Sequence, residues 1–217
     1  MIKLVVFDLD GVITETSEQH FIAWKTLADS KNIVIDREFN ESLKGVSRYD
    51  SIVKILKYGN VLDDYSKEEV KKLMKIKNDN YVKLISKFNE DNINGGVEDL
   101  FIYFKKNNIK IAIGSASRNA PFLIKNMKLD VYIDYIVNPL NLDGKPSPDI
   151  FLDAANHFGI SPTECIGIED AISGIKAINT AGMISIGIGD KKILKDADYV
   201  YDSIGEIDYK VLEEMVK

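Results

Sequence analysis

The sequence predicts an α/β fold in which a parallel sheet, covered by helices on both faces, carries an inserted all-helical domain. Strand-like apolar segments alternate with helical patterns over most of the chain, which is typical of a parallel sheet. About 100 residues separate the first strand-like segment from the second, although a crossover needs only about a dozen residues. Because long structureless loops are uncommon in compact domains, this gap favours a second folded unit.

Five strand-like segments define the expected sheet. They lie near residues 2–8, 109–114, 134–137, 164–168 and 183–188. The first contains a continuous apolar run, Leu4 to Phe7, which is typical of a strand buried on both faces. The helices expected between the strands cover Val97–Asn107, Ala120–Met127, Asp149–Phe158 and Ala171–Thr180.

The inserted segment carries helical periodicity, with apolar residues spaced as on one face of a helix. Its stripes are Phe21, Trp24, Leu27 and Ala28, then Ile52, Ile55 and Leu56, then Val70, Leu73, Met74, Lys77, Tyr81, Leu84 and Ile85. Ser66 followed by Glu69 predicts a capping box for the third of these helices. The expected inserted domain covers residues 15–89, and residues 1–14 and 90–217 form the sheet domain.

Composition and charge exclude several classes of protein. The chain has 217 residues, 28 basic against 34 acidic side chains and a formal charge of −6, which argues against sequence-independent binding to nucleic acid or to an anionic membrane. No apolar run approaches the ~18 residues of a membrane span, and the first strand begins too early for a signal peptide. Cys165 is the single cysteine, so we expect a buried structural thiol and a reducing compartment, the cytoplasm. We also expect a monomer.

Residue types that can carry chemistry follow the expected strands in order. They are Asp8 and Asp10, Ser115, Ser117, Arg118 and Asn119, Lys145, and Glu169 and Asp170. The carboxyl ends of parallel strands meet at one rim of a sheet, where α/β proteins bind ligands. An isolated carboxylate is costly to bury, so a cation should compensate Asp8 and Asp10.

Carboxylates, a lysine and hydroxyl groups together suit a phosphate ester and a hard cation such as Mg²⁺. Asp8 and Asp170 are good direct ligands, a backbone carbonyl near Asp10 is another, and Glu169 is expected to bind or to orient. Asp8 can attack phosphorus as a nucleophile. Asp10 can then act as general acid and base, while Lys145 offsets negative charge.

Two of these motifs have simpler explanations when each is taken alone, and two other kinds of site are excluded. An Asp-X-Asp pair is common on protein surfaces, and Glu169-Asp170 by itself favours a helix N-cap. Residues 6–17 lack the ligand spacing of an EF-hand, and Gly144-Lys145 lacks the partner glycine of a Walker A loop. The hypothesis of one site depends on all the clusters following strands in order.

The chain resembles the haloacid dehalogenase superfamily of phosphotransferases over essentially its whole length. The matching segments are Asp8-Leu-Asp10-Gly-Val12, Ser115, Lys145-Pro-Ser-Pro-Asp149 and Gly167-Ile-Glu169-Asp170. The resemblance implies a Rossmann-like core with a helical cap, in which Asp8 is the nucleophile, Asp10 the acid and base, and Ser115 and Lys145 assist transfer. The implied Mg²⁺ ligands are Asp8, the Asp10 carbonyl and Asp170, with Glu169 close by.

Within the superfamily, the cap segment resembles sugar-phosphate mutases. This implies interconversion of β-D-glucose 1-phosphate and glucose 6-phosphate through a bound β-glucose 1,6-bisphosphate. The matching cap residues are Leu43-Lys-Gly45-Val46-Ser47-Arg48, Ser51 and Lys77-Asn-Asp-Asn80, with Thr16, His20 and Trp24. The implied substrate-binding set adds Leu9, Gly11, Ala116, Ser117, Arg118 and Asn119. A sugar-phosphate phosphatase of the same superfamily is an alternative, and a non-catalytic phosphosugar-binding protein is a third.

A bisphosphate has to be held at both ends. One phosphate is expected at Asp8, Ser115 and Lys145. The other is expected at Arg48 with Ser117, Arg118 and Asn119, since an arginine fork binds phosphate bidentately. Three positions depart from the family pattern: Arg118 stands where lysine is usual, and Gly144 and Ala171 stand where serine is usual.

Overall fold

The computed structural model describes residues 1–43 and 46–216, and within these ranges the chain forms two compact units. One unit joins Met1–Glu15 to the segment that runs from Phe88 to the C-terminal end, and the other is Thr16–Lys87. The predicted inserted domain, 15–89, begins one residue earlier and ends two residues later than the second unit.

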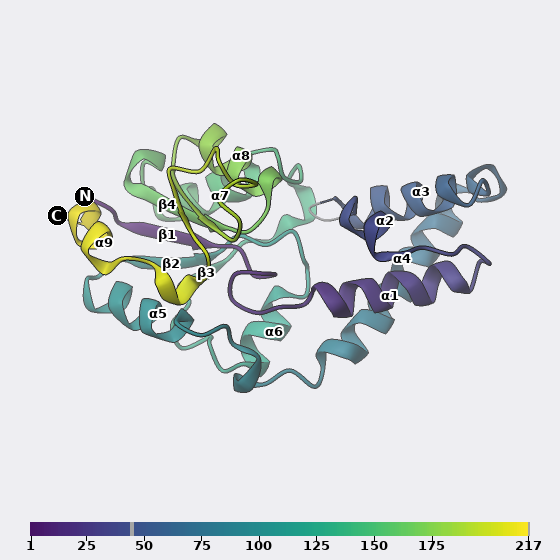
Figure 1. Ribbon diagram of the computed structural model, residues 1–217, viewed down its shortest axis with the longest axis horizontal. Helices are drawn as coiled ribbons and strands as arrows, with labels where there is room; N and C mark the ends of the chain where they lie inside the picture. The colour runs from purple at the N-terminus through teal and green to yellow at the C-terminus, as the bar shows by residue number, and fades with distance from the viewer. Residues whose placement is uncertain (44–45, 217) are drawn as a thin grey trace. The chain divides into compact units, whose positions relative to one another are not determined.

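A parallel sheet forms the centre of the first unit; in the described ranges it has six strands in the order β3-β2-β1-β4-β5-β6 (Figure 1). The strands are β1 (Leu4–Phe7), β2 (Lys110–Ile113), β3 (Tyr135–Ile136), β4 (Cys165–Glu169), β5 (Ile184–Ile188) and β6 (Tyr199–Tyr201). All neighbouring strands in it run parallel. This strand order is that of a Rossmann-like sheet, so the predicted fold class is confirmed.

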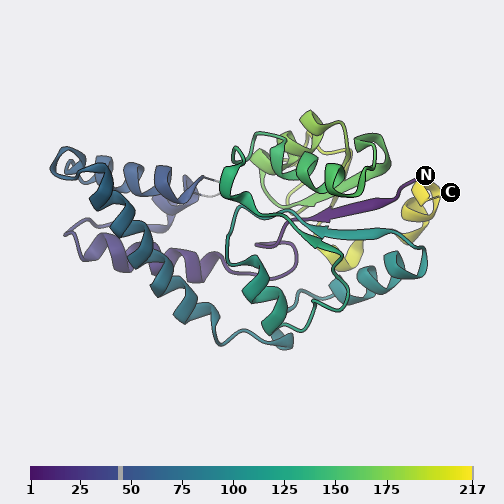
Figure 2. The ribbon, with the colours of Figure 1, turned by 180° about the vertical axis from the view of Figure 1, so that it is seen from behind.

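Helices cover both faces of this sheet. They are α5 (Val97–Lys106), α6 (Ala120–Asn126), α7 (Asp149–Phe158), α8 (Ile172–Ala181) and α9 (Tyr209–Val216), with short 3-10 turns η2 (Glu90–Asn92), η3 (Pro139–Asn141), η4 (Pro162–Glu164) and η5 (Ile204–Glu206). Figures 1 and 2 show α7 and α8 on one face and α5 with α6 on the other.

The central strand β1 is buried on both faces, as its apolar run predicts. Successive side chains of a strand point to opposite faces. Leu4 and Val6 belong to a buried cluster that includes residues of α7 and α8. On the other face, Phe7 packs edge-on against Phe101 of α5, with ring centroids 5.0 Å apart. Cys165 is buried in β4, as expected for a structural thiol.

Two elements at the C-terminal end are missing from the sequence-based prediction. β6 has only three residues, and α9 has eight, of which only Leu212 is buried. α9 lies beside the N-terminus in both views (Figures 1 and 2), where the Ile2 N–H donates to the Met215 carbonyl at 3.1 Å.

The second unit is helical. In the described part of the chain it contains α1 (Ser17–Asp29), α2 (Arg37–Glu41), the helix α3 (Arg48–Tyr58), the turn η1 (Leu62–Asp64) and α4 (Lys67–Ile85). The predicted capping box is confirmed, because the Glu69 N–H donates to Ser66 Oγ and the Ser66 N–H donates to Glu69 Oε2. Periodicity misses α2 because its five residues make little more than one turn. Among the described residues, no helix is long and apolar enough to span a membrane.

Candidate active site

The acids that end β1 and β4 lie where the strand order of the sheet reverses. Phe7 is paired with Ile168, and the Asp8 N–H donates to the Ile168 carbonyl at 2.9 Å. On the other side of β1, the Gly114 N–H donates to the Phe7 carbonyl at 2.8 Å. Asp8, Glu169 and the turn after β2 therefore stand at one level of the sheet, at the crevice where such sheets bind ligands.

Lys145 supplies the cation that burial of Asp8 requires. Lys145 lies in the loop before α7, and the side chains of Lys145 and Asp8 are both buried. Its Nζ donates to Asp8 Oδ1 and, at 2.6 Å, to Glu169 Oε1. One ammonium group thus joins acids from two neighbouring strands, which is the compensation that the sequence predicts.

The two carboxylates at the end of β4 have different neighbours. Glu169 is 2% exposed, and its Oε2 accepts the Ala171 N–H at 2.8 Å. The Asp170 carboxylate lies against Gly11, because a Cβ at position 11 would come 2.2 Å from Asp170 Oδ2. Gly11 also has a φ of +87°, which favours glycine. The turn after β1 therefore needs glycine to approach Asp170 closely.

Burial and the negative charges of neighbouring acids raise the pKa of two of these carboxylates. Burial, helped by the charges of Glu169 and Asp10, raises the pKa of Asp8 to about 7 against the opposing effect of Lys145. Burial and the charges of Glu169 and Asp8 raise the pKa of Asp170 to about 8. Burial by itself would lower the pKa of Lys145, but Asp8 and Glu169 outweigh it and raise that pKa. Lys145 is therefore protonated at neutral pH, and one lysine does not balance the acids around it.

Three of these acids fit a divalent metal ion. Asp8, Glu169 and Asp170 each offer one carboxylate oxygen, and the three oxygens lie within 4.8 Å of one another. Divalent hard cations prefer such ligands, and an ion here would offset the excess negative charge. The side chain of Asp10 is outside this group, which leaves its backbone carbonyl as the expected ligand.

The backbone after β1 is held by its own hydrogen bonds. Leu9 is fully buried, and its carbonyl accepts the N–H groups of Ile13 and Thr14 at 3.0 and 3.1 Å. The Gly11 N–H donates to the Thr14 carbonyl at 2.8 Å. Asp10 is half-buried and forms an isolated bridge with Thr14. Since its carbonyl is already used, Leu9 can contribute only its N–H to a ligand.

The turn after β2 brings a second group of predicted residues together. Ser115 is buried, and its Oγ accepts the Ser117 N–H at 3.0 Å. The Ser117 Oγ accepts the Asn119 N–H at 3.3 Å. Ala116 and Arg118 are exposed. The two hydroxyls therefore fix the shape of the turn, while the side chain of Arg118 extends from it.

The loop that carries Lys145 is closed by a residue to which the sequence analysis assigns no role. Asp149 Oδ2 accepts the Asp143 N–H at 3.0 Å, and its Oδ1 accepts the Ser147 hydroxyl at 2.8 Å. The Ser147 N–H also donates to the Gly144 carbonyl at 3.0 Å. An acid in the first turn of a helix is the sequence signal that could have identified this brace.

The helical unit holds a second buried lysine among the predicted substrate-binding residues. Lys77 Nζ lies 2.8 Å from His20 Nδ1 and 4.4 and 4.7 Å from the ring centroids of Trp24 and Tyr81. Burial, with the charges of Lys77 and Arg48, holds the pKa of His20 well below its usual range. The imidazole is therefore neutral at neutral pH, so its Nδ1 can accept from Lys77.

Three further predicted residues with a described structure belong to this unit and differ in burial. Thr16, at the N-cap of α1, is fully buried, and Ser51 is buried in α3. Val46 is half-buried, and its N–H donates to the Leu43 carbonyl at 3.2 Å. Gly45, which was predicted to bind substrate, lies outside the described residues.

The start of α3 presents the predicted arginine. Ser47 is the N-cap, and its Oγ accepts the Asp50 N–H at 3.2 Å and donates to Asp50 Oδ2 at 2.6 Å. Arg48 follows as the first residue of the helix and is half-buried. Ser47 therefore fixes the backbone from which the Arg48 side chain departs.

Two of the three departures from the family pattern leave the acid cluster intact. Ala171 bonds Glu169 through its backbone N–H, which a serine would supply equally. A Cβ at Gly144 would meet no atom within 4 Å, so a serine would also fit there. Nothing in the structure explains arginine rather than lysine at position 118.

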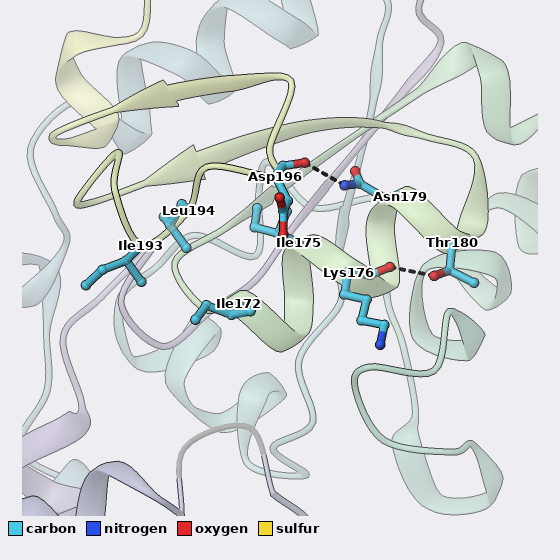
Figure 3. Close-up of a pocket in the computed structure, with 8 residues that line it drawn as sticks. All are labelled: Ile172, Ile175, Lys176, Asn179, Thr180, Ile193, Leu194 and Asp196. Atoms are coloured by element: carbon cyan, nitrogen blue, oxygen red, sulfur yellow. Dashed lines mark hydrogen bonds between the residues drawn. The ribbon is translucent and has the colours of Figure 1, made fainter.

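A groove on the first unit is distinct from the acid cluster. Figure 3 shows it between α8 and the loop after β5, lined by Ile172, Ile175, Lys176, Asn179, Thr180, Ile193, Leu194 and Asp196. Its polar groups are bonded locally: Asn179 Nδ2 donates to the Asp196 carbonyl, and the Thr180 hydroxyl donates to the Lys176 carbonyl, each at 2.7 Å. The predicted site residues do not line this groove.

Comparison with known proteins places the chain among phosphotransferases. Residues 2–182 match the haloacid dehalogenase-like hydrolase family. A β-phosphoglucomutase of Bacillus subtilis (strain 168) is 43% identical over 213 residues, which are 98% of this chain and 94% of the relative. A phosphorylated carbohydrates phosphatase of Thermotoga maritima is 25% identical over 91% of this chain and 92% of its own.

A solved structure is similar over the whole chain. The crystal structure of a β-phosphoglucomutase from Clostridium difficile matches with a TM-score of 0.95 and 42% identity, covering 100% of this chain and 97% of its own. The similarity therefore includes the helical unit as well as the sheet.

Proposed function

Because the chain belongs to the haloacid dehalogenase-like hydrolase family, we propose that it acts as a β-phosphoglucomutase. It would interconvert β-D-glucose 1-phosphate and glucose 6-phosphate through an aspartyl-phosphate enzyme and β-glucose 1,6-bisphosphate. The observation that carries this proposal is the 43% identity to the Bacillus subtilis mutase over 98% of the chain. The joined acids and lysine of the sheet unit support the chemistry.

Asp8 is the proposed nucleophile, because it ends the central strand beside the only buried ammonium group that the described part of the sheet unit contains. An Asp8 carboxylate oxygen forms a bond to phosphorus while the bond between phosphorus and the sugar oxygen breaks. The same bond then breaks in reverse when a sugar hydroxyl accepts the phosphoryl group. Lys145 holds Asp8 in its attacking position and offsets the charge on the transferred group.

Asp10 is the proposed general acid and base. It would give a proton to the sugar oxygen that leaves phosphorus, and it would take a proton from the sugar hydroxyl that attacks the aspartyl-phosphate. Asp10 is half-buried whereas Asp8 is buried. Two carboxylates in different surroundings can hold different roles at one pH.

The proposed metal is Mg²⁺, held by Asp8, Asp170 and the Asp10 carbonyl with Glu169 close by, where it would neutralise negative charge and orient the phosphate. Mg²⁺ fits this group of residues because it prefers oxygen ligands such as carboxylates. Asp8 and Asp170 both carry a raised pKa without a second cation. A dication would favour the ionised form that Asp8 needs for attack.

The remaining predicted residues are assigned to the sugar and to its second phosphate. Arg48 with Ser117, Arg118 and Asn119 would bind the phosphate that is not being transferred, because guanidinium groups match phosphate oxygens. The residues that would face the sugar are Thr16, His20, Trp24, Gly45, Val46, Ser47, Ser51 and Lys77, together with Leu9, Gly11 and Ala116.

The substrates are small sugar phosphates, the location is the cytoplasm, and the enzyme is a monomer.

The test is ³¹P NMR of purified protein with Mg²⁺, β-glucose 1-phosphate and a trace of the bisphosphate. We expect the glucose 1-phosphate signal to be replaced by that of glucose 6-phosphate. Asp8→Asn, which keeps the side-chain shape but removes the nucleophile, should abolish the conversion while the protein stays folded. Substantial residual activity in this variant would contradict the assignment of Asp8.

The same spectra distinguish the alternatives. Steady release of inorganic phosphate in excess of glucose 6-phosphate would support a phosphatase, which the resemblance to the Thermotoga maritima relative makes the second candidate. Unchanged spectra, with an active control mutase in a parallel tube, would favour a non-catalytic phosphosugar-binding protein.

A further inference from the structure

Gly174 occupies a position where glycine is a poor choice for the local structure. It lies in the first turn of α8 and is buried. Its φ is not positive, so the left-handed region, which favours glycine, is not involved. Because glycine forms helices less readily than alanine, another constraint has to explain it.

That constraint is the carboxylate of Glu169. A Cβ at position 174 would lie 2.0 Å from both Cδ and Oε1 of Glu169 and 2.4 Å from its Cγ. Real Cβ atoms do not approach other heavy atoms so closely. The side chain of Glu169 therefore occupies the space that an alanine methyl group would need.

Glu169 has little freedom to move aside. Its Oε2 accepts the Ala171 N–H at 2.8 Å, and its Oε1 accepts Lys145 Nζ at 2.6 Å. The same ammonium group donates to Asp8. A shift of Glu169 away from α8 would thus break a bond at the helix start or displace the lysine that holds Asp8.

We propose that Gly174 is a positioning residue: its missing side chain admits Glu169 into the first turn of α8, and Glu169 in turn holds Lys145 against Asp8. The inference rests on the proposed function, in which Asp8 and Lys145 carry phosphoryl transfer. The three atoms that a Cβ at position 174 would meet first all belong to Glu169, so Gly174 acts through that residue.

Another buried glycine provides a matched control. A Cβ at Gly167 in β4 would come 2.5 to 2.8 Å from carbon atoms of the Ile178 side chain. This clash is less close than the one at position 174, and it involves only hydrocarbon in the core. Gly167→Ala should therefore lower the stability without any dependence on the Glu169 side chain.

The experiment combines Gly174→Ala with Glu169→Ala in a double-mutant cycle. We measure kcat for phosphate release from 4-nitrophenyl phosphate and the unfolding midpoint in urea, so that the readout does not depend on the sugar. Gly174→Ala should lower kcat by about 10- to 100-fold, since an error of about 1 Å in position has this effect. In the Glu169→Ala background the same change should alter kcat by less than about twofold.

A merely structural role predicts a different result. Gly174→Ala would then lower the rate and the unfolding midpoint equally in both backgrounds, as Gly167→Ala should, and the proposal would be overturned. An unchanged kcat when Gly174→Ala is made in the wild-type protein would also overturn it. If Gly174→Ala does not fold, the double variant should fold, and failure of both would reject Glu169 as the obstructing group.

A readout without catalysis separates this inference from the proposed function. In a crystal structure of Gly174→Ala we expect Glu169 Oε1 to lie beyond about 3.5 Å from Lys145 Nζ, outside hydrogen-bond range. Retention of the 2.6 Å contact would contradict the proposal. Displacement of Glu169 in a protein that transfers no phosphoryl group would leave the positioning role intact and reject the proposed function.

Discussion

Among the residues that the structure describes, each of the two units buries one lysine, and the two lysines have different partners. Lys145 of the sheet unit is bonded to carboxylates of Asp8 and Glu169. Lys77 of the helical unit contacts the neutral imidazole of His20 and the faces of two aromatic rings. Both are almost fully buried, so each needs groups that replace water around its charge.

The difference teaches what each charge can do. Lys145 offsets formal negative charge from two strands, so its position and the positions of the acids depend on one another. The imidazole nitrogen and aromatic faces around Lys77 stabilise a cation through dipoles and quadrupoles without neutralising it. We therefore expect the sheet lysine to govern the reactivity of Asp8 and the helical lysine to set the electrostatic potential around His20.

The largest effect should follow from Lys145→Met, which keeps the hydrocarbon stem and removes the charge. Asp8 and Glu169 would be left buried without their cation, which destabilises proteins by about 3–5 kcal/mol. We also expect kcat to fall by at least about 10²–10³-fold, as on loss of one preorganised donor. Urea unfolding and steady-state kinetics measure both effects.

Lys176→Met is the control, because this lysine is exposed in the same unit. It should change neither quantity. Wild-type stability in Lys145→Met would mean that the two carboxylates do not depend on Lys145, and the contrast between the two lysines would fail.

Arg48→Ala tests whether the helical unit contributes charge to a substrate anion. We expect binding of the bisphosphate to weaken by about 1.5–3 kcal/mol, or roughly ten- to a hundredfold. Stability should change little, because Arg48 is only half-buried. Rates measured at subsaturating bisphosphate report the loss, and rates unaffected by the substitution would count against a role in phosphate binding.

Lys77→Met should raise the pKa of His20, because the charge of Lys77 is one of the causes that lower it, after burial. The pKa can be followed by NMR through the imidazole C–H signals. Lys72→Met, on the exposed side of the same helix, should leave the titration of His20 unchanged. No upward shift for His20 would show that the Lys77 charge does not act on it.

The smallest effect concerns stability against pH. The pKa of His20 is well below 6.5 in the folded protein, so below pH 6.5 the unfolded chain binds a proton that the folded chain does not. Stability should therefore be complete above the unfolded pKa and decline as pH falls, by at most about 1.4 kcal/mol per pH unit for this group. His20→Gln should show a flatter profile in urea titrations between pH 7 and 5, and equal profiles would contradict the assignment.

Much of the fold could be predicted from local pattern. The apolar run of Leu4 to Phe7, the alternation of strands and helices, and the capping box at Ser66 are all encoded in neighbouring residues. The strand β6, with three residues, and the helix α9, with eight, are absent from the prediction. The prediction that a cation compensates Asp8 followed from the cost of an unpaired buried charge.

The candidate site was predictable in its membership and less so in its connections. Residues that follow parallel strands have to meet at one rim, which brought Asp8, Lys145 and Glu169 together in the prediction. The contacts of Asp149 are indicated only by an acid in the first turn of a helix. The space over Gly174 depends on the conformation of the Glu169 side chain, which spacing along the chain does not record. Lys77 was expected on one helix face, and its burial beside His20 became evident only in the structure.

The sequence by itself determined which elements form, which face of each is apolar and which residue types follow the strands, because these depend on spacing along the chain. Tertiary structure decided that Lys145 bonds both Asp8 and Glu169, that Asp170 lies against Gly11 and that Glu169 fills the place of a side chain at Gly174. The contacts of Lys145 with Asp8 and of Asp170 with Gly11 join residues far apart in the sequence, whereas Glu169 reaches Gly174 through the conformation of its side chain. Their distances are set by how strands and helices pack, which no local pattern records.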